Sequence, residues 1–264
     1  MYFVELSENT LLSHELGHKN TLETEDMTLF LTGRVHNCTE IKELLSLPLE
    51  FSELETLAEM YKQKSIQFTQ LIRGEFSLLI WDKAKKKCAL VRDQLGIKPI
   101  YYRYVNKRFY VSDNPVLLAK SINGLLNREF VQSFLTGSEE KFNLTAFDEI
   151  QILPPAHYLL LENNSISITK YWSLKSRINI QRKTEHEYIE KFRELLFDSV
   201  RCRLPESGSI AAELSGGMDS TTVAGVAAVL GAKVKGYSNN LSGEPRNDLP
   251  DETSLVQDFC EMHK

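Results

Sequence analysis

The residues whose types and spacing point most directly to chemistry form the segment 214–220 (LSGGMDS). Two adjacent glycines can adopt positive φ and have no Cβ, so the backbone can approach an anion closely. We expect a helix from about Asp219 to Leu230. The first amides of a helix have no intrahelical partner, and the helix dipole adds positive potential there. The segment therefore predicts a phosphate-binding loop between a strand and a helix.

The side chains of this loop extend the prediction to ATP and Mg²⁺. Ser215 and Ser220 supply hydroxyl donors to phosphate oxygens, and Gly216 and Gly217 let the backbone approach. Asp219 is out of place beside an anion unless Mg²⁺ bridges its carboxylate to the phosphates. No lysine follows the glycines, so the loop differs from a Walker loop built for γ-phosphate transfer. This composition favours a reaction in which pyrophosphate leaves ATP and AMP is transferred.

The alternative for the loop is a tight strand-to-helix turn without a ligand. The glycines would then serve packing, and Asp219 would only interact with the helix dipole. A lone Gly-Gly pair would favour that interpretation. Here two serines and an aspartate coincide with the strand–loop–helix pattern, which favours phosphate binding.

A second motif with chemical potential is the segment 14–18 (HELGH), which spells the HExxH pattern of zinc proteases. Zinc ligation requires both histidines on one face of a stable helix and a third ligand downstream. The segment contains a glycine and its flanks do not extend an amphipathic pattern. We therefore predict that this segment binds no zinc. No ligand spacing relates the other histidines, which are His36, His157, His186 and His263.

The elements around the loop alternate between helix and strand. Thr184 and Glu187 form a capping box before a helix whose apolar face is Tyr188, Phe192, Leu195 and Leu196. A strand over 209–214 leads into the loop, a second strand follows at 233–238, and a further helix is expected over 251–263. This order is the beginning of a doubly wound, Rossmann-like α/β sheet.

The first part of the chain has the pattern of an α+β domain. Aromatic and β-branched runs predict strands at 29–31, 76–81, 88–91, 100–102 and 109–111. Helical periodicity is present over 39–45 and 54–62. Residues 112–183 are expected to form a connecting region with short strands at 158–161 and 165–168. We place the boundary near Arg177, which gives domains 1–176 and 177–264.

The bulk composition excludes several classes of protein. The 264 residues are 42% hydrophobic and carry a net charge of −5, so no basic face indicates nucleic acid as a partner. The basic run 83–87 (KAKKK) fits a hairpin turn. We expect no membrane segment, because the longest run of small apolar residues is 223–232. Scattered cysteines indicate reduced thiols and a cytoplasmic protein; they are Cys38, Cys88, Cys202 and Cys260.

Three segments in order resemble the asparagine synthetase family. Residues 215–220 match its SGGxDS loop, and 74–82 with 91–102 resemble its GxFAFxxWD and RDxxGxKPLYY motifs. Residues 153–158 and Tyr171-Trp172 resemble its LPPGHY and YW motifs. The resemblance implies an Ntn-type glutamine-amidotransferase-like sandwich, followed by an ATP-pyrophosphatase domain that adenylates a carboxylate. It also implies that His14 and Glu15 are part of a strand that resembles the family's LAHERL segment.

The first half departs from the family pattern at the glutaminase residues. Tyr2 stands where these amidotransferases have a cysteine nucleophile. Arg34 replaces the glutamate of the glutamine-binding segment, here residues 32–37, and Ser52-Glu53 matches the family's Gly-Asp. We expect an inactive glutaminase domain, as in lasso-peptide cyclases and β-lactam synthetases.

The second half departs from the pattern after the loop. Only about 45 residues follow it, and the family's SGEGSDE segment is not among them. The similar Ser242-Gly243-Glu244 comes too early. We therefore expect a truncated synthetase domain, either as a fragment of a longer protein or as a shortened gene product.

The resemblance also implies roles for single residues and for partners. Leu214, Ser238 and Asn239 would flank adenine and ribose, Asp219 would hold Mg²⁺, and pyrophosphate would be held by Ser215, Gly216, Gly217 and Ser220. The default product is asparagine; the degenerate glutaminase favours a lasso-peptide cyclase or a β-lactam synthetase. A non-catalytic nucleotide-binding pseudoenzyme is the alternative of another class. Expected partners are a small-molecule or peptide carboxylate and a separate ammonia source or peptide-processing protein.

Overall fold

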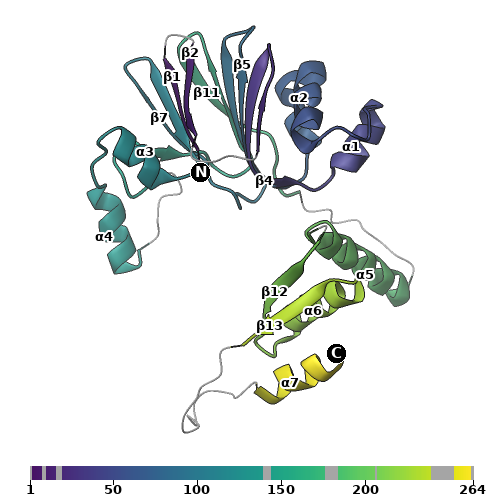
Figure 1. The fold of residues 1–264 in the computed structure, drawn as a ribbon. Coiled ribbons are helices and arrows are strands. Elements are labelled where there is room, and N and C mark those ends of the chain that lie inside the picture. Colours follow the sequence, from purple (N-terminus) through teal and green to yellow (C-terminus); the bar gives the residue numbers. More distant parts are fainter. Residues whose placement is uncertain are drawn as a thin grey trace. The chain divides into compact units, whose positions relative to one another are not determined.

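The computed structural model describes residues 2–7, 10–15, 20–138, 144–175, 184–205, 207–238 and 253–262. The chain divides into two compact units, residues 1–176 and 177–264, which are described separately (Figure 1). No helix in the described ranges has the length and apolar character needed to cross a bilayer.

The first unit contains two antiparallel sheets. One has the strand order β2 (Thr10–Glu15), β1 (Tyr2–Ser7), β8 (Arg108–Ser112), β7 (Tyr101–Val105) and β9 (Gln151–Ile152). The other has the order β11 (Ser165–Lys170), β10 (His157–Glu162), β6 (Lys87–Arg92), β5 (Gly74–Asp82), β4 (Met27–Val35) and β3 (Thr21–Glu23). Side chains of both sheets share one apolar layer, so the unit is a sandwich.

The strand β4, which lies between β5 and the edge strand β3, is buried on both faces. Phe30 points into the layer between the sheets, whereas Leu29 and Leu31 belong to a second core. That second core is closed by α1 (Cys38–Leu45), α2 (Glu53–Lys64) and the 3₁₀ helix η1 (Ser65–Gln70). Burial on both faces explains why β4 and β5 read as continuous apolar runs. Gly33 ends this run with φ 93°, where a Cβ would lie 1.9 Å from the carbonyl oxygen of Glu75.

Two further helices accompany the five-stranded sheet. α3 (Pro115–Ser121) contributes Leu118 and Ala119 to a small core with Phe3 and Ile150. α4 (Arg128–Thr136) follows it (Figure 1). None of the residues of α4 is buried.

The second unit has the predicted alternation of helix and strand. It contains α5 (Glu185–Arg201), β12 (Ser209–Glu213), α6 (Met218–Val229), β13 (Lys233–Tyr237) and α7 (Thr253–Met262). β12 and β13 pair in parallel, from Ser209 opposite Lys233 to Glu213 opposite Tyr237. A small core of Val200, Val226 and Ala227 joins α5 to α6. A helix-connected parallel pair is the unit of a doubly wound sheet, and the fold class predicted for both halves is confirmed.

The region 112–183 differs from the expected connecting region. β10 pairs with β6 and β9 pairs with β7, so both strands extend the sandwich. Leu153 and Leu159 are fully buried between the sheets. These pairings join segments more than 45 residues apart, which a local sequence pattern does not reveal.

The structure shows the start of the segment 14–18 in a strand and most of the basic run 83–87 in a turn. His14 and Glu15 lie on β2, opposite Phe3 and Tyr2, which confirms the strand interpretation; 16–18 lie outside the described residues. No group of three potential metal ligands occurs within the described part of the chain. The basic run closes the β5–β6 hairpin, and its lysines pair with acids: Lys83 with Glu23, Lys85 with Asp82, and Lys87 with Glu162.

Candidate functional site

The loop of the second unit connects the end of β12 to the start of α6. Gly216 has φ 70°, in the left-handed region that favours glycine. Gly217 is the N-cap of α6, with extended backbone and no side-chain cap. The amides that open α6 are therefore left to an external acceptor, because the cap residue has no side chain to supply one. Such a helix start is suited to an anionic ligand.

The two serines of the loop lie together. Their hydroxyl oxygens are 3.2 Å apart, and the Ser215 amide donates to the Ser220 hydroxyl at 3.3 Å. Ser220 in turn donates to the carbonyl of Gly217. Thr221, which the sequence reasoning did not single out, donates to the same carbonyl at 2.8 Å. Two adjacent hydroxyl groups at the positive end of a helix can bind one phosphate group together.

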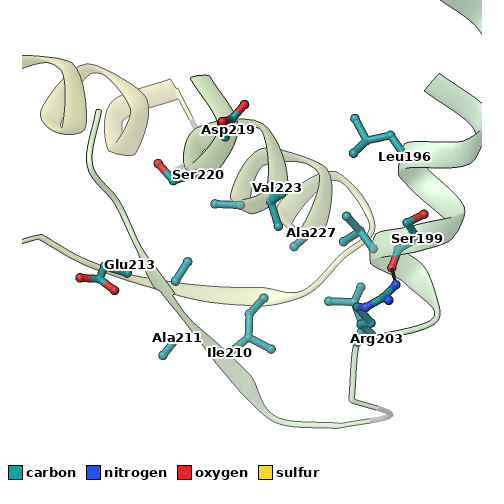
Figure 2. Close-up of a pocket in the computed structure, with 14 residues that line it drawn as sticks. Leu196, Ser199, Arg203, Ile210, Ala211, Glu213, Asp219, Ser220, Val223 and Ala227 are labelled. Atoms are coloured by element: carbon teal, nitrogen blue, oxygen red, sulfur yellow. Dashed lines mark hydrogen bonds between the residues drawn. The ribbon is translucent and has the colours of Figure 1, made fainter. Parts of the chain in front are cut away.

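Asp219 is exposed in the first turn of α6. Figure 2 shows it with Ser220 at the start of α6, on the rim of a cavity of about 760 Å³ between α5, β12 and α6. A single carboxylate does not make a metal cage. It does fit Mg²⁺, which binds through one or two carboxylates together with phosphate oxygens and water.

The cavity beside the loop is mostly apolar. Its lining from α5, β12 and α6 includes Leu196, Val200, Ile210, Val223 and Ala227. Arg203 and Glu213 add charge, and Arg203 donates to the Ser199 carbonyl at 2.8 Å (Figure 2). No motif in the sequence identified these two charged residues as neighbours of the loop.

The residues predicted to flank the nucleotide follow the two parallel strands. Leu214 is 2% exposed, and its amide donates to the Tyr237 carbonyl at 2.7 Å. Ser238 comes directly after β13, and parallel pairing brings it to the same sheet end as the loop. Asn239 lies outside the described residues.

In the first unit, the position expected for a nucleophile is held by a core aromatic residue. The Tyr2 side chain is fully buried between the sheets, and its ring stacks on Phe30 with 5.5 Å between centroids. Burial raises the pKa of its hydroxyl well above the ordinary value. The Tyr2 amide donates to Asp113 at 3.0 Å, and the Thr32 hydroxyl donates to the other oxygen of the same carboxylate. Residue 2 is thereby fixed in the sandwich.

The two cysteines of the first unit have raised thiol pKa values. Burial raises the pKa of the Cys38 thiol to about 12, with a smaller contribution from Glu53. Cys88 is fully buried, and burial raises its pKa further. Because the thiolate is the reactive form, a raised pKa lowers the reactivity of both side chains at neutral pH.

The residues that match the family's glutamine-binding segment sit at the end of β4 and the start of α1. Glu53 accepts a hydrogen bond from the Val35 amide. Burial raises the pKa of the Glu53 carboxyl, whereas this hydrogen bond and the charge of Arg34 lower it. Arg34 is exposed on β4, opposite Glu75.

The motif 91–102 has a structural role in this fold. Asp93 is fully buried, and its carboxylate accepts from the amides of Leu95, Ile97 and Lys98 at 2.9–3.1 Å. The Arg92 guanidinium donates to the carbonyls of Leu153 and Gly96. A buried carboxylate held by three amides fixes a tight loop and leaves little capacity for a ligand.

Comparison with known proteins identifies both units. Residues 14–172 match the family described as "Glutamine amidotransferase domain", and residues 191–264 match the one described as "Asparagine synthase". The chain is 33% identical over 228 residues to asparagine synthetase (glutamine-hydrolyzing) 2 of Bacillus subtilis, which covers 78% of this chain and 30% of that protein.

Two further relatives come from a fungus and an archaeon. Amidase chry2 of Gibberella zeae is 30% identical over 207 residues, covering 74% of this chain and 30% of that protein. Putative asparagine synthetase (glutamine-hydrolyzing) 2 of Methanocaldococcus jannaschii is 26% identical over 245 residues, covering 90% and 47%. The chain spans less than half the length of these three relatives. With a glutamine amidotransferase domain followed by an asparagine synthase match, the chain belongs to the asparagine synthetase family.

Proposed function

We propose that the second unit binds ATP with Mg²⁺ on the loop 214–220 and belongs to an amide-forming ligase. The observation that carries this proposal is the loop itself. Two serine hydroxyls 3.2 Å apart meet the uncapped start of α6, and an exposed carboxylate lies in its first turn. Hydroxyls and amides suit phosphate oxygens, and the carboxylate suits the metal ion that accompanies them.

The reaction consistent with this loop has two transfers. A substrate carboxylate oxygen attacks the α-phosphorus of ATP, and pyrophosphate leaves. An amine nitrogen then attacks the activated carbonyl carbon, an amide bond forms, and AMP leaves. Ser215, Ser220 and the opening amides of α6 would hold the pyrophosphate through its departure. When bound, Mg²⁺ would neutralise phosphate charge, with Asp219 as its protein ligand.

The first unit, in this proposal, does not hydrolyse glutamine. Tyr2 fills the place of the family's nucleophile, and burial keeps the Cys38 and Cys88 thiols protonated. The amine must then come from elsewhere. This favours, as a second candidate, a ligase that joins an amine and a carboxylate of one substrate, as a lactam-forming or macrocyclising enzyme does. Otherwise a separate ammonia source would serve an asparagine-forming enzyme.

The test is exchange of labelled pyrophosphate into ATP by the full chain. Aspartate and a peptide carboxylate are supplied in separate assays, each with Mg²⁺. Acid-dependent exchange that is lost in Ser220→Ala supports carboxylate activation, and the acid that promotes it identifies the substrate class. ATP binding without exchange for any acid would favour the non-catalytic alternative. Absence of ATP binding would refute the assignment of the loop.

Glutamine hydrolysis is tested separately. Incubation with glutamine should release no glutamate above a control without protein. Thiol-dependent release of glutamate and ammonia would contradict the proposal and point to Cys38 or Cys88.

A further inference from the structure

The backbone carbonyl of Gly217, at the start of α6, accepts hydrogen bonds from three donors. The Thr221 hydroxyl donates to it at 2.8 Å, the Thr221 amide at 3.3 Å and the Ser220 hydroxyl at 3.3 Å. A carbonyl oxygen has two lone pairs, and a hydrogen bond between a hydroxyl and an oxygen is most often about 2.7–2.8 Å long. Thr221 therefore makes the strong bond to this carbonyl, and the contact of Ser220 is the weak one.

The Ser220 hydroxyl makes only long contacts within the loop. It lies 3.3 Å from the Gly217 carbonyl oxygen and 3.2 Å from the Ser215 hydroxyl, and it accepts from the Ser215 amide at 3.3 Å. A serine hydroxyl has one proton to donate, and no short bond in the loop holds that proton. A phosphate oxygen offers a shorter, charge-assisted bond. The proton of Ser220 is therefore available to a ligand at the start of α6.

A hydroxyl bond to the carbonyl four residues earlier is common in helices and is not by itself a functional feature. In α4, for example, the Thr136 hydroxyl donates in this way to the Gln132 carbonyl at 2.9 Å. The bond of Thr221 differs because the carbonyl that it reaches is also an acceptor for Ser220. The two side chains are therefore linked through one oxygen atom.

We propose that Thr221 is a positioning residue for nucleotide binding. It satisfies the Gly217 carbonyl and thereby leaves the Ser220 proton for a phosphate oxygen of ATP. Without the Thr221 hydroxyl, this carbonyl depends more on Ser220, whose proton then stays turned toward the backbone. Thr221 acts through Ser220 and does not itself touch the ligand. The inference rests on the proposed function, because it requires ATP on the loop 214–220.

Calorimetric titration of the full chain with ATP and Mg²⁺ tests the proposal. Thr221→Val replaces the hydroxyl by a methyl group of similar size and should raise the dissociation constant roughly threefold to tenfold, as for one lost hydrogen bond. Thr221→Ser keeps the donor and should bind as the wild type does. Thr222→Val is the matched control, because it makes the same replacement at the next, exposed position of α6 and should leave the affinity unchanged. Thermal unfolding establishes that the variants are folded.

A double-mutant cycle separates this role from a purely structural one. Ser220→Ala removes the hydroxyl through which Thr221 acts, so adding Thr221→Val to it should weaken binding no further. Additive losses would show that Thr221 supports only the helix and would overturn the inference. Wild-type affinity in Thr221→Val, or a loss in Thr221→Ser equal to that in Thr221→Val, would overturn it and leave the proposed function standing. A wild type that binds no ATP would refute the proposed function and this inference with it.

Discussion

The hydroxyl of Tyr171 donates a hydrogen bond of 2.7 Å to the backbone carbonyl of Arg92, 79 residues earlier in the chain. The Tyr171 amide also donates to the carbonyl of Ala156, whose own amide donates to the carbonyl of Asp93. The segment after β11 is thereby tied to the loop that follows β6. Motifs that are far apart in the sequence form one hydrogen-bonded unit.

Tyr171→Phe should destabilise the first unit by about 0.5–1.5 kcal/mol, because it removes the donor to a buried carbonyl without changing the packing. Calorimetric unfolding of the full chain would measure the loss. Tyr104→Phe is the control, since the Tyr104 hydroxyl bonds to the Asn164 carbonyl at an exposed site. Equal effects from the two substitutions would show that burial of the Arg92 carbonyl is not decisive.

Gly96→Ala should destabilise the first unit strongly. Gly96 has φ 71°, and a Cβ there would lie 2.7 Å from the side chain of Pro155 and 3.0 Å from that of Arg92. Gly137→Ala separates the two causes, because Gly137 has φ 62° and no heavy atom within 4 Å of the added Cβ. The control should cost about 1 kcal/mol for backbone strain, and Gly96→Ala about 1–3 kcal/mol more. Thermal unfolding of both variants decides whether the contact with Pro155 matters.

Glu53→Gln should stabilise the chain at pH 7. Burial is the largest effect on Glu53 and raises the pKa of its carboxyl above the unfolded value. The protonated form is then favoured in the folded state, so this contribution to stability is complete below the unfolded pKa of about 4.3 and is lost as pH rises through the folded pKa. Glutamine retains an oxygen for the Val35 amide and carries no charge to bury.

Melting temperatures of Glu53→Gln and wild type should therefore differ at pH 7 and converge near pH 4. Glu50→Gln makes the same charge change at an exposed position and should leave the melting temperature unchanged at both pH values. A variant less stable than wild type at pH 7 would show that the carboxylate charge is needed, with Arg34 as its partner.

Asp219→Ala should weaken binding of ATP in the presence of Mg²⁺ and leave the fold intact. An exposed aspartate in a first helical turn contributes little to stability. We expect Mg²⁺ to increase the affinity of the wild type for ATP by about 1–2 kcal/mol, as for one charge-assisted contact, and to leave the variant unchanged. Glu213→Gln alters a second carboxylate of the same cavity and should keep the metal dependence. Equal metal dependence in wild type and Asp219→Ala would show that Asp219 interacts only with the helix terminus and does not bind the metal ion.

The sequence was sufficient to predict structure where the residues that determine it are close together in the chain. The loop 214–220 combines glycines, serines and a helix start within seven residues, so its strand–loop–helix geometry could be predicted. The short strands predicted at 158–161 and 165–168 likewise correspond to β10 and β11, which pair with each other across a two-residue connection.

Contacts between residues far apart in the chain could not be predicted from local sequence patterns. Neither the pairing of β10 with β6 nor the burial of Asp93 leaves a periodic pattern. The charged residues Arg203 and Glu213 reach the cavity only because α5 and β12 pack beside α6. The strand β1 also went unrecognised, because its pairing with β8 joins residues about 100 positions apart.

The burial of β4 on both faces affects how the register of this strand is set when the sandwich folds. A strand with one polar face has its register set by hydrophobicity, because a one-residue slip exposes the core side. β4 has apolar residues on both faces, so such a slip would merely exchange Phe30 with Leu29 or Leu31. Gly33 supplies the missing constraint. A slip would bring Thr32 or Arg34 against the Glu75 carbonyl, where no Cβ fits. One small residue thus excludes misaligned sheets that apolar burial alone would tolerate.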